Sequence, residues 1–132
     1  MRGQTNLQQL LRTMKPALNE GEFVFYSLPD LSVIHINDII FSFKEKEGFT
    51  VILEKSLADK LNISYSFVAA WITLTVHSSL EAVGLTAAFS KALADEQISC
   101  NVVAGFYHDH IFVKKQDAEK AMLVLQGLSQ QG

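Results

Sequence analysis

The chain has 132 residues, of which 48% are hydrophobic and 19% are charged, so it can bury a core and is not a disordered protein. Its net charge of −3 and its pI near 5.7 exclude the strongly basic surface that nucleic-acid binding requires. No apolar run approaches the length of a membrane span, the N-terminus lacks the apolar core of a signal peptide, and a lone Cys100 cannot form an internal disulfide. We therefore expect a cytoplasmic protein that binds neither nucleic acid nor a membrane.

The first expected elements are a helix and a strand. Four apolar residues at helical spacing predict an N-terminal helix that ends near Pro16: Leu7, Leu10, Leu11 and Met14. Residues 22–28 predict a strand that ends at Pro29 and Asp30. Residues 31–38 fit either a short helix or an irregular crossing.

A hairpin and a short helix are expected next. Residues 39–55 predict two strands around the turn 45–48. Ser56 and Asp59 then have the spacing of a capping box for a short helix over 56–62. Asn62 is a plausible end for that helix.

The strand expected over 67–77 has one core face and one mixed face. Side chains alternate along a strand, so one side carries only apolar residues: Val68, Ala70, Ile72, Leu74 and Val76. The other side begins with Phe67, Ala69 and Trp71 and then becomes polar. This pattern favours a sheet that helices cover on one side and that is partly covered on the other.

The rest of the chain predicts a helix, two strands and a last helix. A helical stripe runs over 85–93, a strand over 98–107, a hairpin turn over 107–110 and a returning strand over 111–114. A helix that starts near Asp117 carries the final apolar stripe. The second half thus lacks one strand of a βαββαβ order, and that strand must come from elsewhere or be absent.

A weak internal repeat links the two halves. Residues 51–61 align without a gap to residues 111–121, and each copy follows a predicted hairpin and leads from a strand into a helix. This pattern indicates a duplicated module whose first copy has lost most of its crossover helix.

The second half resembles the ACT domain, a small ligand-binding module of amino-acid metabolism. The family signature is an acidic residue three before a glycine, an apolar residue after it, a helix ending in leucine, and a strand. Those places are taken by Glu81, Gly84, Leu85, Leu93 and Ile98. The match spans about residues 66–128, with Val83 where the family usually has proline. The whole chain is similar to small bacterial tandem-ACT proteins and to the regulatory half of aspartate kinases.

The resemblance implies an α+β fold of ferredoxin-like βαββαβ-type modules, with antiparallel sheets and helices on one face. It implies a degenerate ACT-like module over 1–62 and an ACT domain over 63–132. It also implies that a ligand binds at an interface between modules or subunits, beside the first strand–helix loop. The candidate ligand-binding residues are His77, Ser78, Ser79, Leu80, Glu81, Val83, Gly84, Leu85, Pro29 and Asp30.

The residue types of this loop fit an amino-acid ligand. Free N–H groups at a helix N-terminus favour a carboxylate, and Gly84 lets a ligand approach them closely. Glu81 or Asp30 could pair with the ligand's ammonium group. An ordinary structural interpretation stays open, because Ser78 and Glu81 have capping-box spacing and Gly84 could serve only close packing.

Other candidate sites are weaker. His77, His108 and His110 could in principle hold a metal, but hairpin tips are polar in any case, so we expect no metal and no cofactor. Cys100 alternates with apolar neighbours and is interpreted as a small buried hydrophobe. No nucleophile–base set or phosphate loop is recognisable, so we expect no enzymatic activity.

The expected function is therefore non-catalytic. The leading hypothesis is a regulatory sensor that binds an amino acid or related metabolite and signals by changed association, most simply as a homo-oligomer. The alternative is a structural or interaction protein whose ACT modules only mediate oligomerisation, with the Trp71 face as its interface.

Overall fold

The computed structural model describes residues 7–76 and 83–131. The chain forms two compact units. We call Glu20–Ala69 the central unit, and Met1–Asn19 together with Ala70–Gly132 the split unit. Each unit has its own core, as the residues below show.

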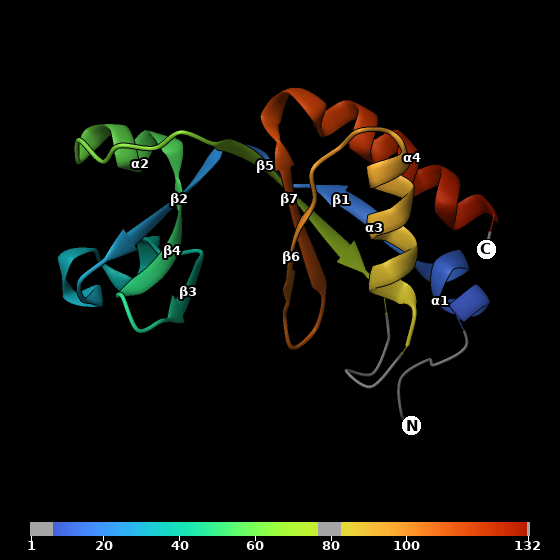
Figure 1. Ribbon diagram of the computed structural model, residues 1–132, viewed down its shortest axis with the longest axis horizontal. Helices are drawn as coiled ribbons and strands as arrows, with labels where there is room; N and C mark the ends of the chain where they lie inside the picture. Colours follow the sequence, from blue (N-terminus) through green and yellow to red (C-terminus); the bar gives the residue numbers. More distant parts are fainter. Residues whose placement is uncertain (1–6, 77–82, 132) are drawn as a thin grey trace. The chain divides into compact units, whose positions relative to one another are not determined.

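The central unit is an antiparallel sheet with one short α-helix (Figure 1). Its elements are β2 (Phe23–Leu28), the 3₁₀ helices η1 (Leu31–Val33) and η2 (Ile36–Asp38), β3 (Phe41–Lys44), β4 (Phe49–Glu54) and α2 (Lys55–Lys60). The strand order is β3-β4-β2, and β2 also pairs with the start of β5 at Val68 and Ala69. The predicted strands are thus confirmed, and the ambiguous segment 31–38 consists of two single 3₁₀ turns.

The start of α2 corrects one prediction. Glu54, and not Ser56, is the N-cap, and its side chain makes no capping hydrogen bond. Ser56 lies inside the helix, so the expected capping box does not form. The end of the helix agrees better with the sequence, because Asn62 has a φ of +57°, a left-handed conformation that asparagine tolerates.

The split unit contains the other antiparallel strands and the longer helices (Figure 1). Its elements are α1 (Leu7–Thr13), β1 (Lys15–Leu18), β5 (Val68–Thr75), α3 (Leu85–Asp95), β6 (Asn101–Ala104), β7 (Asp109–Lys114), the 3₁₀ helix η3 (Lys115–Asp117) and α4 (Ala118–Gln131). The strand order is β1-β5-β7-β6. Strand β1 pairs antiparallel with β5 from Lys15↔Thr75 to Leu18↔Ile72. The strand missing from the second half therefore comes from the N-terminal segment.

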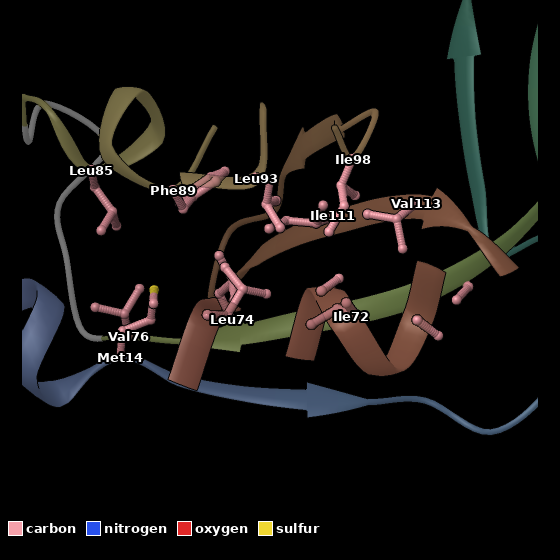
Figure 2. Close-up of a cluster of buried hydrophobic side chains, with 14 of the residues drawn as sticks. Met14, Ile72, Leu74, Val76, Leu85, Phe89, Leu93, Ile98, Ile111 and Val113 are labelled. Carbon is pink, nitrogen blue, oxygen red and sulfur yellow. The ribbon is translucent and has the colours of Figure 1, made fainter. Parts of the chain in front are cut away.

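The core of the split unit lies between its sheet and its helices (Figure 2). Ile72 and Leu74 of β5, and Val76 just after it, all lie on the predicted core face and are 0–5% exposed. They pack with Leu85, Phe89 and Leu93 of the predicted stripe on α3, with Ile111 and Val113 of β7, and with Met14 and Leu10. The helical and strand periodicities thus place the core correctly, and the N-terminal segment contributes to it.

The core of the central unit is smaller. Its buried members come from β2, β4, α2 and the crossing: Val24, Leu28, Ile34, Val51, Leu53 and Ala58. Together the two cores confirm the expected α+β class with antiparallel sheets and helices.

The β6–β7 hairpin differs from its sequence prediction. Strand β6 covers only Asn101–Ala104, and the turn lies at 105–108 instead of 107–110. The Gly105 N–H donates to the His108 carbonyl at 2.9 Å, which closes the turn two residues earlier than predicted. His110 consequently lies in β7, opposite Val103.

The internal repeat is confirmed in three dimensions. Strands β4 and β7 have the same sequence of buried and exposed positions. Each follows a hairpin closed by equivalent backbone hydrogen bonds, Glu45 N–H to Gly48 and Gly105 N–H to His108. Glu54 and Lys114, which precede the following helices, have ψ of 137° in both cases. The crossover helix α3 has only the two 3₁₀ turns as its counterpart, as the sequence predicts.

No helix in the described ranges is both long enough and apolar enough to cross a membrane. The division into sequence modules at 1–62 and 63–132 stays a prediction, because a sequence module need not coincide with a compact unit.

Candidate functional site

The start of α3 is the part of the predicted strand–helix loop that the structure describes. His77, Ser78, Ser79, Leu80 and Glu81 lie outside the described residues. Val83 is 81% exposed, whereas Leu85 is buried in the core of the split unit. The described part of the site is therefore anchored through Leu85 and open to solvent at Val83.

Gly84 is the N-cap of α3 and has a left-handed conformation, with φ +97° and ψ −16°. Its carbonyl accepts the N–H of Ala88 at 2.9 Å, the first hydrogen bond of the helix. Because glycine has no side chain, the N-cap residue itself cannot accept from the N–H groups of the first turn. These N–H groups, together with the positive end of the helix dipole, therefore favour an anion at the start of α3, as the sequence predicts.

The structure also explains why a glycine stands at this position. A positive φ strains residues that have a Cβ, and a Cβ added here would lie 3.3 Å from Cδ2 of Leu7. Among the described residues, the group that approaches Gly84 closely is therefore the Leu7 side chain of α1. Close packing and backbone conformation are sufficient reasons for the glycine, and neither one tests whether a ligand also approaches it.

Pro29 and Asp30, the remaining predicted site residues, lie in the central unit at the end of β2. The Asp30 carboxylate accepts hydrogen bonds from both the backbone N–H and the hydroxyl of Ser32, and so caps η1. These hydrogen bonds lower the pKa of Asp30. The Asp30 carboxylate, which the sequence predicts as a partner for a ligand ammonium group, is therefore already hydrogen-bonded within a local turn.

A polar network lies in the split unit where sequence analysis expected a hairpin tip. Trp71 Nε1 donates to His110 Nδ1 at 3.0 Å, and Thr73 Oγ1 lies 3.2 Å from the same nitrogen. The Asn19 side-chain amide donates to Thr73 Oγ1 at 2.9 Å. Burial, and then the nearby His108, lower the pKa of His110, while burial raises the pKa of Asp109.

This network gives no support to a metal site. The rings of His108 and His110 have centroids 6.4 Å apart, and His77 lies outside the described residues. Within residues 7–76 and 83–131, no three His, Cys, Asp or Glu side chains are grouped so that they could hold a metal ion. Cys100 is half-buried, and burial raises the pKa of its thiol, which makes it a poor nucleophile.

The central unit contains a second polar cluster, which no sequence pattern above predicted. Lys55 Nζ lies 3.1 Å from Asp59 Oδ2, and the Tyr65 hydroxyl donates to Asp59 Oδ1 at 2.6 Å. Two surface hollows flank α2 here. The first has a volume of 320 Å³ and is lined by Gly21, Glu22, Glu54, Lys55, Ser56 and Asp59. The second has a volume of 370 Å³ and is lined by Asn37, Asp38, Ile40, Glu54, Ser56, Leu57 and Lys60. The i, i+4 spacing of Lys55 and Asp59 could have indicated the ion pair, but nothing local indicates Tyr65.

Two protein-family models match the chain, one in each half. One ACT-domain model matches residues 2–70, and a second ACT-domain model matches residues 66–127. The chain belongs to the ACT-domain family. It carries two ACT domains in tandem, and such domains typically bind small regulatory molecules.

One solved structure is similar to the chain over almost the whole length of both. A protein of unknown function from Vibrio cholerae, described as a possible transport protein, is 43% identical to the chain, with a TM-score of 0.85. The match covers 95% of this chain and 97% of that one. No curated protein matches the chain.

Two aspartate kinases share the fold at low identity. The Clostridium acetobutylicum enzyme is 12% identical, with a TM-score of 0.63, and the match covers 87% of this chain but 34% of the kinase. Escherichia coli aspartokinase III, solved with aspartate and ADP, is 17% identical, with a TM-score of 0.58, and 90% and 33% of the two chains are covered. The chain thus resembles about a third of each of these kinases.

Proposed function

We propose that this tandem ACT protein is a non-catalytic sensor that binds an amino acid or a related metabolite in the cytoplasm. The observation that supports it most is the start of α3, where the signature residue Gly84 is an N-cap without a side chain and the signature residue Leu85 is the first residue of the helix. A ligand carboxylate would accept from the first-turn N–H groups, and Glu81 would pair with its ammonium. Binding would then bias how subunits associate.

The test is thermal unfolding of the full chain with each of the standard amino acids at millimolar concentration. A ligand that binds only the folded state stabilises it by about 2.7 kcal/mol at a hundredfold excess over its dissociation constant. One selective upward shift is expected. The amide derivative of the same amino acid, which lacks the carboxylate, should shift the midpoint little.

Glu81→Gln is the variant to compare, with Glu119→Gln as its matched control. Glu119 is an exposed glutamate in the first turn of α4, far from the signature residues in sequence. The first substitution should remove most of the ligand-induced shift, and the second should leave it unchanged. Gly84→Val is unsuitable, because φ +97° and the nearby Leu7 make it a folding variant. No shift with any amino acid would contradict the proposal.

One observation favours the alternative, in which the modules serve only association. Phe106 and Tyr107 at the tip of the β6–β7 hairpin are 84% and 79% exposed. Large exposed aromatic residues are typical of protein interfaces. If no ligand is found and the chain oligomerises, this function replaces the sensor.

A further inference from the structure

Leu7, the first residue of α1, packs beside the start of α3, where the ligand site is proposed. A Cβ built on Gly84 would lie 3.3 Å from Cδ2 and 3.8 Å from Cδ1 of Leu7, so both methyl groups of the leucine face the glycine. The two helices are in contact, and both belong to the split unit (Figure 1). A group that approaches the Cα of Gly84 from this side therefore also meets Leu7.

The packing of α1 holds Leu7 in this place. Leu10 and Met14 are both 0% exposed in the core of the split unit. At the end of α1, the Ser129 hydroxyl donates to the carbonyl of Met14 at 2.9 Å and lies 3.4 Å from that of Arg12. Leu7 itself is only partly buried against the core. The helix thus presents an anchored apolar wall, part of which stays accessible to a small molecule.

The described surroundings of Gly84 are apolar and uncharged. Residues 7–11 and 83–90 contain no lysine, arginine, histidine, aspartate or glutamate. Val83, directly before the glycine, is 81% exposed and adds a second apolar side chain. The next charged residue of α3 is Lys91, about 10 Å from Gly84 along the helix axis. Lys91 is paired with Asp95 at 2.8 Å. These two segments therefore offer no counter-charge to a charged ligand side chain.

An apolar side chain is the kind that this wall favours. A charged side chain would lose its hydration against Leu7 without gaining a partner, whereas an apolar side chain gains free energy when it leaves water. The proposed function assigns the ligand carboxylate to the first-turn N–H groups of α3 and the ammonium group to Glu81. The side chain is then the part of the ligand that Leu7 can select.

We propose that Leu7 is a specificity-determining residue of this site and that the ligand is an amino acid with an apolar side chain. The ligand class rests on the proposed function, to which it adds the side chain that the site selects. Leu7 lies outside residues 66–127, which the second ACT-domain model matches. The N-terminal segment, and not the domain that carries the signature loop, thus supplies the wall that discriminates between ligands.

Calorimetric titration of the full chain with five amino acids tests the ligand class. L-Leucine and L-methionine should bind at least about tenfold more tightly than L-alanine, because a missing methylene in an apolar pocket costs about that factor or more. L-Aspartate and L-lysine should bind more weakly than L-alanine. These comparisons need no substitution, since all five ligands share the same carboxylate and ammonium groups.

Leu7→Ala tests the residue. It should weaken the binding of L-leucine about tenfold and leave that of L-alanine nearly unchanged, because only the longer side chain reaches the wall. A general loss of packing would weaken both ligands alike. Leu11→Ala is the matched control, since Leu11 is another partly buried leucine of α1 that packs against the same core. It should leave the preference for leucine over alanine unchanged. If Leu7→Ala does not fold, Leu7→Val gives the same comparison with a smaller expected loss.

The outcomes separate this inference from the proposed function. If none of the standard amino acids binds, both are overturned. Selective binding of aspartate, lysine or another charged amino acid leaves the sensor in place but overturns the apolar ligand class. A leucine-over-alanine preference that is the same in the wild type and in the Leu7 variants overturns the role of Leu7.

Discussion

Trp71 Nε1 donates a hydrogen bond to Nδ1 of His110, and this contact joins β5 to β7 through their side chains. An indole N–H can only donate, so Nδ1 must accept and the neutral imidazole carries its proton on Nε2. The Trp71 ring also stacks on Phe112 at 6.0 Å, with an interplanar angle of 19°. The only tryptophan of the chain is therefore held beside a titratable ring.

The Trp71–His110 contact predicts a pH-dependent fluorescence. Protonation would place a second donor at Nδ1 against the indole N–H and break the contact. Because the folded pKa of His110 lies below 6.5, this change should occur below that pH. In a fluorescence titration, His110→Gln should remove the transition, and His35→Gln, at an exposed histidine of the central unit, should keep it.

The free energy of unfolding should also depend on the protonation of His110, and it should fall as the pH is lowered. The unfolded histidine binds its proton more tightly than the folded one, so the free energy of unfolding is highest above the unfolded pKa near 6.5. This contribution is lost as the pH falls from there to the lower folded pKa. Denaturant unfolding at a series of pH values measures it, and a His110→Gln chain with the same pH slope in that window would contradict the prediction.

Gly84→Ala and Gly127→Ala are expected to change stability in opposite directions. The left-handed conformation of Gly84 costs an alanine about 1–2 kcal/mol, and the added Cβ meets Leu7. Gly127 lies within α4 with nothing within 4 Å of the added Cβ, so alanine should stabilise by about 0.5–1 kcal/mol. Chemical denaturation measures both. Repeating Gly84→Ala in a Leu7→Ala background separates the contact, which should disappear, from the backbone cost, which should remain.

Met14→Ala should destabilise the chain by about 2–5 kcal/mol, because Met14 is 0% exposed in the core of the split unit. Leu18→Ala, in the same N-terminal segment, should cost much less, since Leu18 is 42% exposed. Urea unfolding compares the two variants. Equal losses would mean that the N-terminal segment does not pack in the split unit as described.

Asp59→Asn should make Tyr65 more acidic. The hydrogen bond to Asp59, followed by burial, raises the pKa of Tyr65 above its usual value of 10, because ionisation would set a phenolate against a carboxylate. Removal of that charge should bring the pKa back toward 10. NMR titration of Tyr65 measures it, and Asp38→Asn serves as a control at another aspartate of the central unit. An unchanged Tyr65 titration in Asp59→Asn would contradict the contact.

Segments with a clear periodicity were predictable, and the short strand β1 was not. The alternation of Ile72, Leu74 and Val76 and the stripe of Leu85, Phe89 and Leu93 each specify a buried face, because one face of a strand or helix must leave water. Strand β1 has only Lys15–Leu18, includes Pro16 and shows no alternation. Its extended conformation depends on pairing with β5, which no local pattern reveals.

The candidate site divides in the same way. The signature around Gly84 was recognisable because a glycine at a helix start is locally unfavourable and so conspicuous. The close contact of Leu7 with Gly84 was not recognisable, because the two residues are far apart in sequence. Residues 107–110 were predicted as the turn because hairpin tips are polar, but pairing with Val103 and the hydrogen bond from Trp71 hold His110 in a strand.

By itself, then, the sequence determined the fold class, the core faces of β5 and α3, the repeat and the family, since these depend on periodicity and on residues close together in the chain. Only the tertiary structure decided that the N-terminal segment completes the sheet of the split unit and that Leu7 packs on Gly84. These depend on contacts between distant residues, whose free energy exists only once the chain has brought them together.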